Sequence, residues 1–105
     1  MEPIVMRLRA SKEKYFRELE EIAKSGGRHW AENSAEYEDL VRLADLEGDV
    51  TFQEFKAAID PNDDLSKEDF INSFGEDIFS DEYVAVFVRT AVERFEEIRD
   101  QLTSR

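Results

Sequence analysis

Apolar residues recur at the three- and four-residue spacing of an amphipathic helix near both ends of the chain. Between residues 11 and 27, one side of such a helix carries a shared apolar set: Tyr15, Phe16, Leu19, Ile22 and Ala23. Toward the other end, apolar positions step by 4, 3, 4, 3 and 4 residues, which is a heptad seam: Val84, Val88, Ala91, Phe95, Ile98 and Leu102. The pattern therefore predicts a helix in each region, the second of them long.

Both end regions also contain a stretch that is compatible with a strand. Residues 4–10 alternate between apolar and polar, although Pro3 suits the first turn of a helix that runs on into residues 11–27. Residues 83–89 are rich in β-branched side chains, but the helical spacing that follows favours one continuous helix. We predict an all-α, small orthogonal bundle of four to five helices with a long C-terminal helix. The alternative is an α+β fold with short strands at 4–10 and 83–89.

Helix-start signals divide the middle of the chain into short helices. Asn33 and Ser34 are cap candidates for a helix over residues 35–48, which Gly48 would end. Two further starts have the capping-box spacing, in which a hydroxyl residue precedes an acid by three positions: Thr51 with Glu54, and Ser66 with Asp69. Ser80, followed by two acids, has the composition of the start of the last helix.

Glycine and proline mark the expected joints between these helices at Gly26–Gly27, residues 60–62 and Gly75. A chain of 105 residues has the size of one domain, and it contains no apolar run of about 18 residues that would cross a membrane. The first residues do not have the apolar core of a secretory signal, and there is no cysteine. We expect a single acidic helical domain over residues 1–105, in the cytoplasm and away from membranes.

The charge of the chain is concentrated in its middle. Residues 1–30 carry seven bases and five acids (+2), residues 31–82 carry three bases and seventeen acids (−14), and residues 83–105 carry four of each, which gives the net charge of −12. So acidic a segment would repel phosphate, which disfavours nucleic acid as a direct partner. It favours a partner with a basic surface.

One acidic stretch has the spacing of calcium ligands. If Glu54 takes the twelfth position of a loop, Asp45, Glu47 and Thr51 fall at the third, fifth and ninth, and Gly48 falls at the sixth. In this the stretch resembles the EF-hand loop, but its first ligand position falls on Leu43. The same residues also fit a turn between two helices, in which Gly48 ends the first helix and the Thr51–Glu54 capping box starts the second. We therefore predict no metal site, and a degenerate calcium-binding protein is the third functional hypothesis.

Other catalytic chemistry has little support in the sequence. There is one histidine, His29, with no cysteine to complete a zinc site, and no nucleophile elbow or glycine-rich phosphate loop is present. We expect no enzymatic activity, no catalytic residues and no cofactor. The neighbouring Trp30, in what the glycines mark as a polar link, is interpreted as a lid over the core or as an exposed contact.

The first functional hypothesis follows from the charge. We predict a small protein-binding module that inhibits a basic partner, such as a nuclease, a toxin or a DNA-binding regulator, by covering its nucleic-acid-binding or functional surface as a mimic of phosphate. The acids expected on the contact face come from the middle of the chain: Glu36, Asp39, Glu47, Asp60, Asp63, Asp64, Glu68, Glu76 and Asp77.

The second hypothesis follows from the apolar C-terminal region, where Val86, Phe87 and Val92 lie off the heptad seam. A helix that is apolar on two faces is buried on two sides, and the second side would pair with another copy or with a regulatory protein. Together with Trp30, these residues form the predicted apolar contact of a homodimer or of an anti-activator that sequesters its target.

Overall fold

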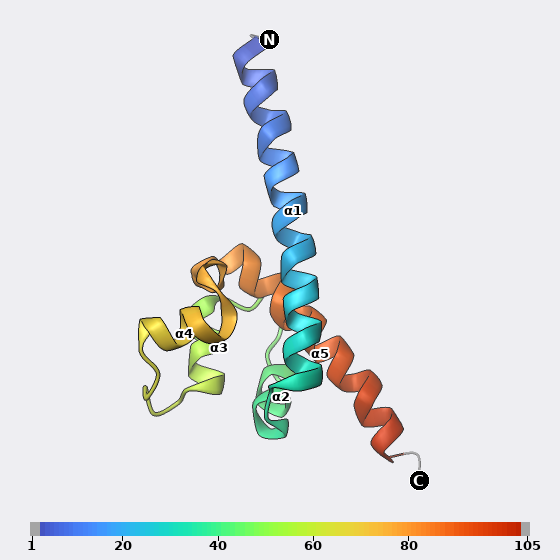
Figure 1. Ribbon diagram of the computed structural model, residues 1–105. Helices are drawn as coiled ribbons and strands as arrows, with labels where there is room; N and C mark the ends of the chain where they lie inside the picture. Colours follow the sequence, from blue (N-terminus) through green and yellow to red (C-terminus); the bar gives the residue numbers. More distant parts are fainter. Residues whose placement is uncertain (1–2, 104–105) are drawn as a thin grey trace.

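The computed structural model describes residues 3–103, and the part of the chain that it describes consists of helices and loops (Figure 1). The elements are α1 (Pro3–Asn33), α2 (Tyr37–Ala44), α3 (Phe52–Ile59), α4 (Lys67–Phe74), the short 3-10 helix η1 (Glu76–Phe79) and α5 (Asp81–Thr103). The predicted all-α bundle with a long C-terminal helix is confirmed. The alternative with strands at 4–10 and 83–89 is wrong, because both ranges are helical. In a helix their backbone groups bond within the segment, whereas a lone strand has no partner.

The two long helices, α1 and α5, pack against each other and carry most of the core. From α1 the buried positions are Leu19, Ala23, Gly27 and Trp30. The heptad seam of α5 is buried as expected at its first four positions: Val84, Val88, Ala91 and Phe95. The shorter elements close the core with their own buried side chains: Leu40, Leu43, Val50, Phe55, Ala58, Phe70 and Ile78.

Aromatic rings occupy the centre of this core. The Trp30 ring lies 5.9 Å from Phe55, 5.7 Å from Phe74 and 5.6 Å from Phe87, measured between centroids. Rings at such distances attract one another through their quadrupoles, and this attraction adds to the hydrophobic stabilisation that comes from the surface area they bury. The expectation that Trp30 lies in a polar link is wrong: it is an interior residue of α1, 8% exposed, and it joins α1 to α3, α4 and α5.

The Gly26–Gly27 pair is a point of close helix contact rather than the expected joint. α1 runs through both glycines without a break. A Cβ atom placed on Gly27 would lie 2.3 Å from the carbonyl oxygen of Phe87 in α5, a distance at which backbone would have to move. Glycine at this position therefore lets the backbones of α1 and α5 approach more closely than any side chain would allow.

The short helices begin largely where the sequence indicates. Thr51 with Glu54 and Ser66 with Asp69 form complete capping boxes at the starts of α3 and α4. The caps expected at Asn33 and Ser34 are wrong: Asn33 is the last residue of α1, and its side-chain amide donates to the carbonyl oxygen of His29. α2 instead starts after Glu36, with no side-chain cap, and it ends at Ala44, so that Gly48 lies in the following loop with φ +71°.

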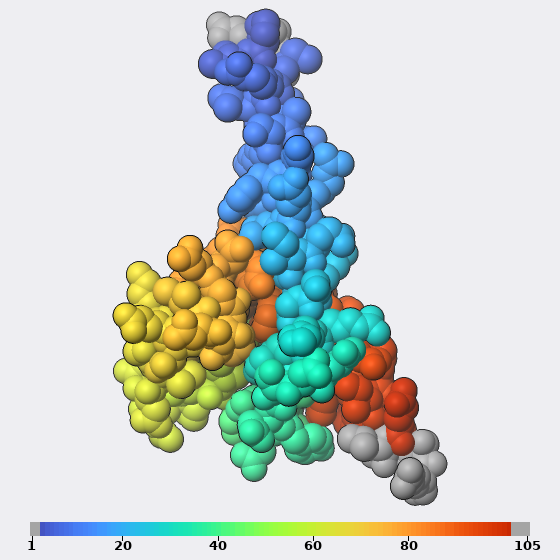
Figure 2. All heavy atoms as spheres, in the orientation of Figure 1, coloured from blue at the N-terminus to red at the C-terminus, as the bar shows by residue number. Residues whose placement is uncertain are grey.

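The first half of α1 extends beyond the rest of the molecule (Figure 1, Figure 2). Every residue from 3 to 18 is exposed, and the first buried position of α1 is Leu19. This extension accounts for the elongated outline of 59 × 34 × 23 Å. The chain thus comprises a packed helical body and a protruding segment, residues 3–18, which we call the arm.

Replacing Gly27 by alanine separates two opposing effects. Helix propensity alone would stabilise α1 by about 1 kcal/mol, whereas the overlap of the new methyl group with the Phe87 carbonyl would cost more. We expect Gly27→Ala to lower the free energy of unfolding by about 1–3 kcal/mol in urea denaturation. The control Ser25→Ala, at an exposed position of the same helix, should change it by less than about 0.5 kcal/mol. A stabilised Gly27→Ala would show that the two backbones are free to separate.

Candidate partner-binding surfaces

Many acids of the middle segment serve the starts of helices. Nine of the seventeen lie in a first turn: Glu38, Asp39, Glu54, Glu68, Asp69, Glu76, Asp77, Asp81 and Glu82. Carboxylates are favourable there because they face the unpaired N–H groups and the positive end of the helix dipole. Asp81 also accepts the N–H of Phe52 at 2.9 Å, which ties the start of α3 to the start of α5. Half of the charge excess therefore has a role within the fold.

Asp60, one of the predicted contact acids, is buried and holds the loop between α3 and α4. Its carboxylate accepts the backbone N–H of Asp64 at 2.8 Å and that of Leu65 at 3.0 Å, and it lies 3.6 Å from the Lys56 ammonium. Burial raises the pKa of Asp60, but these hydrogen bonds and Lys56 outweigh it, so the pKa lies below its usual value. At 6% exposure Asp60 is a structural residue, which corrects its assignment to a partner surface.

Two further predicted contact acids are exposed or half-buried but already paired. Asp63 binds Lys56, and its hydrogen bond is the main reason why the pKa of that lysine is raised. Asp39 accepts a hydrogen bond from Arg42 at 2.7 Å on the surface of α2. The paired base cancels part of the field of each carboxylate, but an exposed ion pair is worth little, so these carboxylates can exchange partners. Asp39 and Asp63 therefore stay candidates, though weaker ones.

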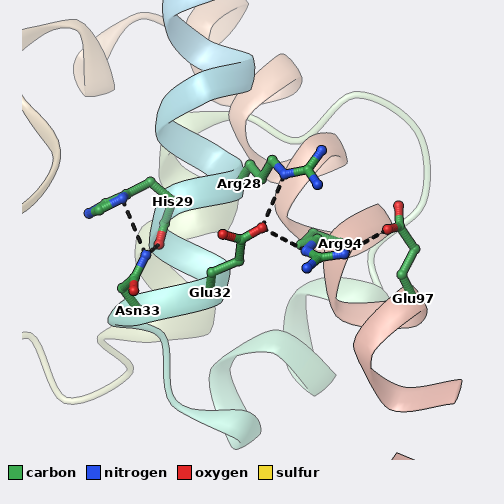
Figure 3. Close-up of polar contacts among 6 residues, drawn as sticks. All are labelled: Arg28, His29, Glu32, Asn33, Arg94 and Glu97. Atoms are coloured by element: carbon green, nitrogen blue, oxygen red, sulfur yellow. Dashed lines mark hydrogen bonds and ion pairs between the residues drawn. The ribbon is translucent and has the colours of Figure 1, made fainter. Parts of the chain in front are cut away.

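A cluster of four charged residues joins α1 to α5 (Figure 3). Glu32 accepts a hydrogen bond from Arg28 at 3.0 Å and from Arg94 at 2.7 Å, and Arg94 also binds Glu97 at 2.9 Å. Desolvation raises the pKa of Glu32, but the two arginines outweigh this effect and lower it. Close by, the side-chain amide of Asn33 lies 3.2 Å from Nδ1 of His29. The cluster is self-neutralising, so it connects two helices and offers no net field to a partner.

Five acids of the middle segment lie neither in a first turn nor in an ion pair: Glu36, which is the N-cap of α2 but makes no side-chain cap, and Asp45, Glu47, Asp49 and Asp64. All five are exposed, and their side chains have no hydrogen bond or ion pair within residues 3–103. Asp45 is the C-cap of α2, where a negative charge opposes the helix dipole, and Glu47 and Asp49 follow it in the loop that leads to α3. We call residues 45–49 the acidic loop. The carboxylates of the acidic loop make no stabilising side-chain contact within the described chain.

The acidic loop borders a groove against α5. The groove has a volume of about 200 Å³, and its walls include Asp49 and Val50 on one side and Val88, Arg89 and Val92 on the other. Its lining combines buried apolar side chains with three exposed acids, Asp49, Glu93 and Glu96, and one exposed base, Arg89. The charge around the groove is therefore mainly negative and would suit a basic side chain with a long aliphatic stem. Of the contact residues predicted from the sequence, Glu47 belongs to the acidic loop and Val92 to the groove.

The residues predicted to form an apolar contact surface belong mostly to the core. Phe87 is 2% exposed and Trp30 is 8% exposed, while Val86 and Val92 are half-buried against the same core. The second apolar face of α5 is covered because the short helices pack on it, which the sequence pattern of α5 alone does not reveal. Trp30 and Phe87 are therefore corrected from surface residues to core residues.

Nothing in the described range brings metal ligands together. Within residues 3–103 there is no group of three or more His, Asp or Glu side chains placed to hold an ion. In the stretch that resembles a calcium loop, Glu54 is used by the capping box, where its carboxylate accepts the N–H of Thr51 at 3.2 Å. The same range has no helix with the length and apolar content that crossing a membrane requires.

The chain was compared with family models, curated proteins and solved structures, and none of them matches it. Function is therefore inferred from the residues and their surroundings.

Neutralising Asp60 should give a stability loss that depends on pH. In Asp60→Asn an amide nitrogen would face a backbone N–H, so we expect the melting temperature at pH 7 to fall by several degrees. Since the folded-state pKa of Asp60 lies below the ordinary value of 3.8, the stabilisation is complete above that pH and is lost as the pH falls through the folded-state value. Circular dichroism melts should thus show the gap between variant and wild type closing below pH 3.8.

The neighbouring substitution Asp64→Asn is the control. Its side chain is exposed and makes no hydrogen bond or ion pair within the described chain, so its melts should stay close to those of the wild type. A gap between Asp60→Asn and wild type that stays constant down to strongly acidic pH would contradict an ionised, hydrogen-bonded Asp60.

Proposed function

We propose that this protein is a small acidic binding module that covers a basic surface on a partner protein. The observation that carries the proposal is the acidic loop, in which the side chains of Asp45, Glu47 and Asp49 are exposed and make no hydrogen bond or ion pair within residues 3–103. The partner class is the one inferred from the sequence: a protein whose positive surface ordinarily binds nucleic acid, such as a nuclease, a toxin or a DNA-binding regulator. The effect on it is inhibition by occlusion.

The distribution of charge supports this mechanism. The acidic loop belongs to a segment with a net charge of −14, so its local potential adds to a wider negative field that would steer a basic partner. Glu36 and Asp64, which are exposed and unpaired within the described chain, extend that field. Such steering raises association rates and selects against acidic competitors. The groove beside the loop would add short-range contacts of complementary shape to this long-range electrostatic attraction.

The self-repulsion of the loop supports it as well. Three carboxylates within five residues repel one another, and Asp45 at the C-terminus of α2 also opposes the dipole of that helix, so both effects work against the compact free protein. A basic partner would remove that repulsion on binding, so the unfavourable arrangement in the free protein becomes part of the binding free energy. The same loop makes no use of the calcium-ligand spacing, because Glu54 is engaged elsewhere.

The test compares two triple variants that remove the same charge. The loop variant is Asp45→Asn/Glu47→Gln/Asp49→Asn, and the control is Glu68→Gln/Glu76→Gln/Asp77→Asn on α4 and η1. Each is used with wild type to capture proteins from the native host at about 50 mM and about 500 mM salt, followed by mass spectrometry. We expect wild type to retain a basic protein at low salt only, the loop variant to lose it, and the control to keep most of it.

Binding constants for the captured protein then decide the mechanism. The loop variant should bind at least about tenfold more weakly, mainly through slower association. Equal losses of affinity in both variants would show that the partner responds to the total charge of residues 31–82 and not to the acidic loop in particular. Binding that is indifferent to salt would reject the electrostatic proposal.

A further inference from the structure

The arm of α1 exposes apolar side chains that the body does not cover. Seven of the ten large hydrophobic residues that are exposed in the described chain lie on α1: Ile4, Val5, Met6, Leu8, Tyr15, Phe16 and Ile22. A protein rarely leaves so much apolar surface contiguous unless something binds to it. The body alone therefore does not explain the sequence of this helix.

Four of these side chains form one stripe along the helix. Ile4, Leu8, Tyr15 and Ile22 are separated by 4, 7 and 7 residues, so they fall on one side of α1, and each is 51–60% exposed. The stripe is distinct from the face that packs on the body, since Ile22 is exposed while the adjacent Ala23 is fully buried. A second helix could thus follow the stripe from the arm to Ile22 alongside the body. We call these four residues the arm stripe.

The helix of the arm gains little stability from the body. Every residue from 3 to 18 is exposed, so these turns of α1 depend mainly on helix propensity and on their continuity with the packed half of α1. The arm also contains the β-branched residues Ile4 and Val5, which lower helix propensity. Local pairs such as Lys14 with Glu18, 4.0 Å apart and highly exposed, contribute little.

The charges beside the stripe identify the partner as a second copy of the same helix in antiparallel orientation. Residues 3–12 carry three bases and no acid (+3), whereas residues 13–22 carry two bases and four acids (−2). Two such helices attract each other when antiparallel, because each basic half lies against an acidic half, and they repel each other when parallel. Antiparallel pairing also keeps the two acidic bodies at opposite ends.

We propose that the protein forms a homodimer in which two arms pair antiparallel through their stripes. In the register that places Ile4 beside Ile22 of the other copy, Arg7 of each copy comes opposite Glu21 of the other. Both residues flank the stripe on the same side, two whole heptads apart. The basic end of each arm then also lies near the acidic body of its partner. This inference does not depend on the proposed function, which concerns the acidic loop.

The other class of occupant for a basic, apolar helix is a membrane surface. The arm has the composition of such helices, with bases beside aliphatic and aromatic residues. The body argues against a membrane surface, because residues 31–82 carry a net charge of −14 and would be repelled by anionic lipid. The second copy has no such conflict, and the membrane serves as an alternative outcome of the test.

A charge-swap experiment on the full chain tests the dimer and its orientation. Sedimentation velocity from about 1 µM to about 500 µM at low salt should show wild type passing from monomer to dimer. Arg7→Glu and Glu21→Arg should each raise the dimer dissociation constant by about tenfold or more, and the double variant should return it to within about threefold of wild type. Helical content by circular dichroism should rise with concentration as the arm becomes ordered.

The control is Glu13→Arg, which makes the same change in net charge as Glu21→Arg but on the side of α1 opposite the stripe. It should leave the dissociation constant unchanged, and so should the loop triple variant. The proposal is overturned if wild type stays monomeric throughout, or if the double variant dimerises no better than either single variant. Binding of a monomeric wild type to phosphatidylglycerol vesicles would assign the arm to membranes instead.

Discussion

The fold depends on the close approach of α1 and α5 at Gly27. Because this glycine has no side chain, the Phe87 carbonyl comes within the space that a Cβ would occupy, and the two longest helices meet backbone to backbone. That contact places Trp30, one turn further along α1, among the rings of Phe55, Phe74 and Phe87. The three short helices then pack around the aromatic cluster, so their positions follow from that of the helix pair.

The fold class and most helix starts could be predicted from the sequence, because they depend on local patterns. The capping boxes at Thr51 and Ser66 involve residues three apart, and the seam of α5 repeats every seven residues. The errors concern features that are defined by another part of the chain. Gly26–Gly27 has the local signature of a joint, and only the presence of Phe87 across the helix pair gives Gly27 its real role.

The candidate surfaces were less predictable for the same reason. The charge pattern assigns Glu47 to the contact face, whereas Asp45 enters only through the calcium-loop spacing and Asp49 is not singled out at all. Asp60 and Phe87 have the residue types of a contact surface, and both are buried through partners far along the chain or across the core. A signal in the sequence did mark the acidic loop: three acids fall within five residues, next to Gly48, in the loop between α2 and α3.

The position of Trp30 has a practical consequence for spectroscopy. It is the only tryptophan, and it lies in the aromatic core three residues before Asn33, where α1 ends, so it is at the opposite end of that helix from the arm. Its fluorescence should therefore report the integrity of the body and remain silent when something docks on residues 3–18. Tyr15, exposed in the arm, has the complementary environment. Tryptophan emission thus follows the body separately from the arm, whereas tyrosine emission also includes Tyr37 and Tyr83 of the body.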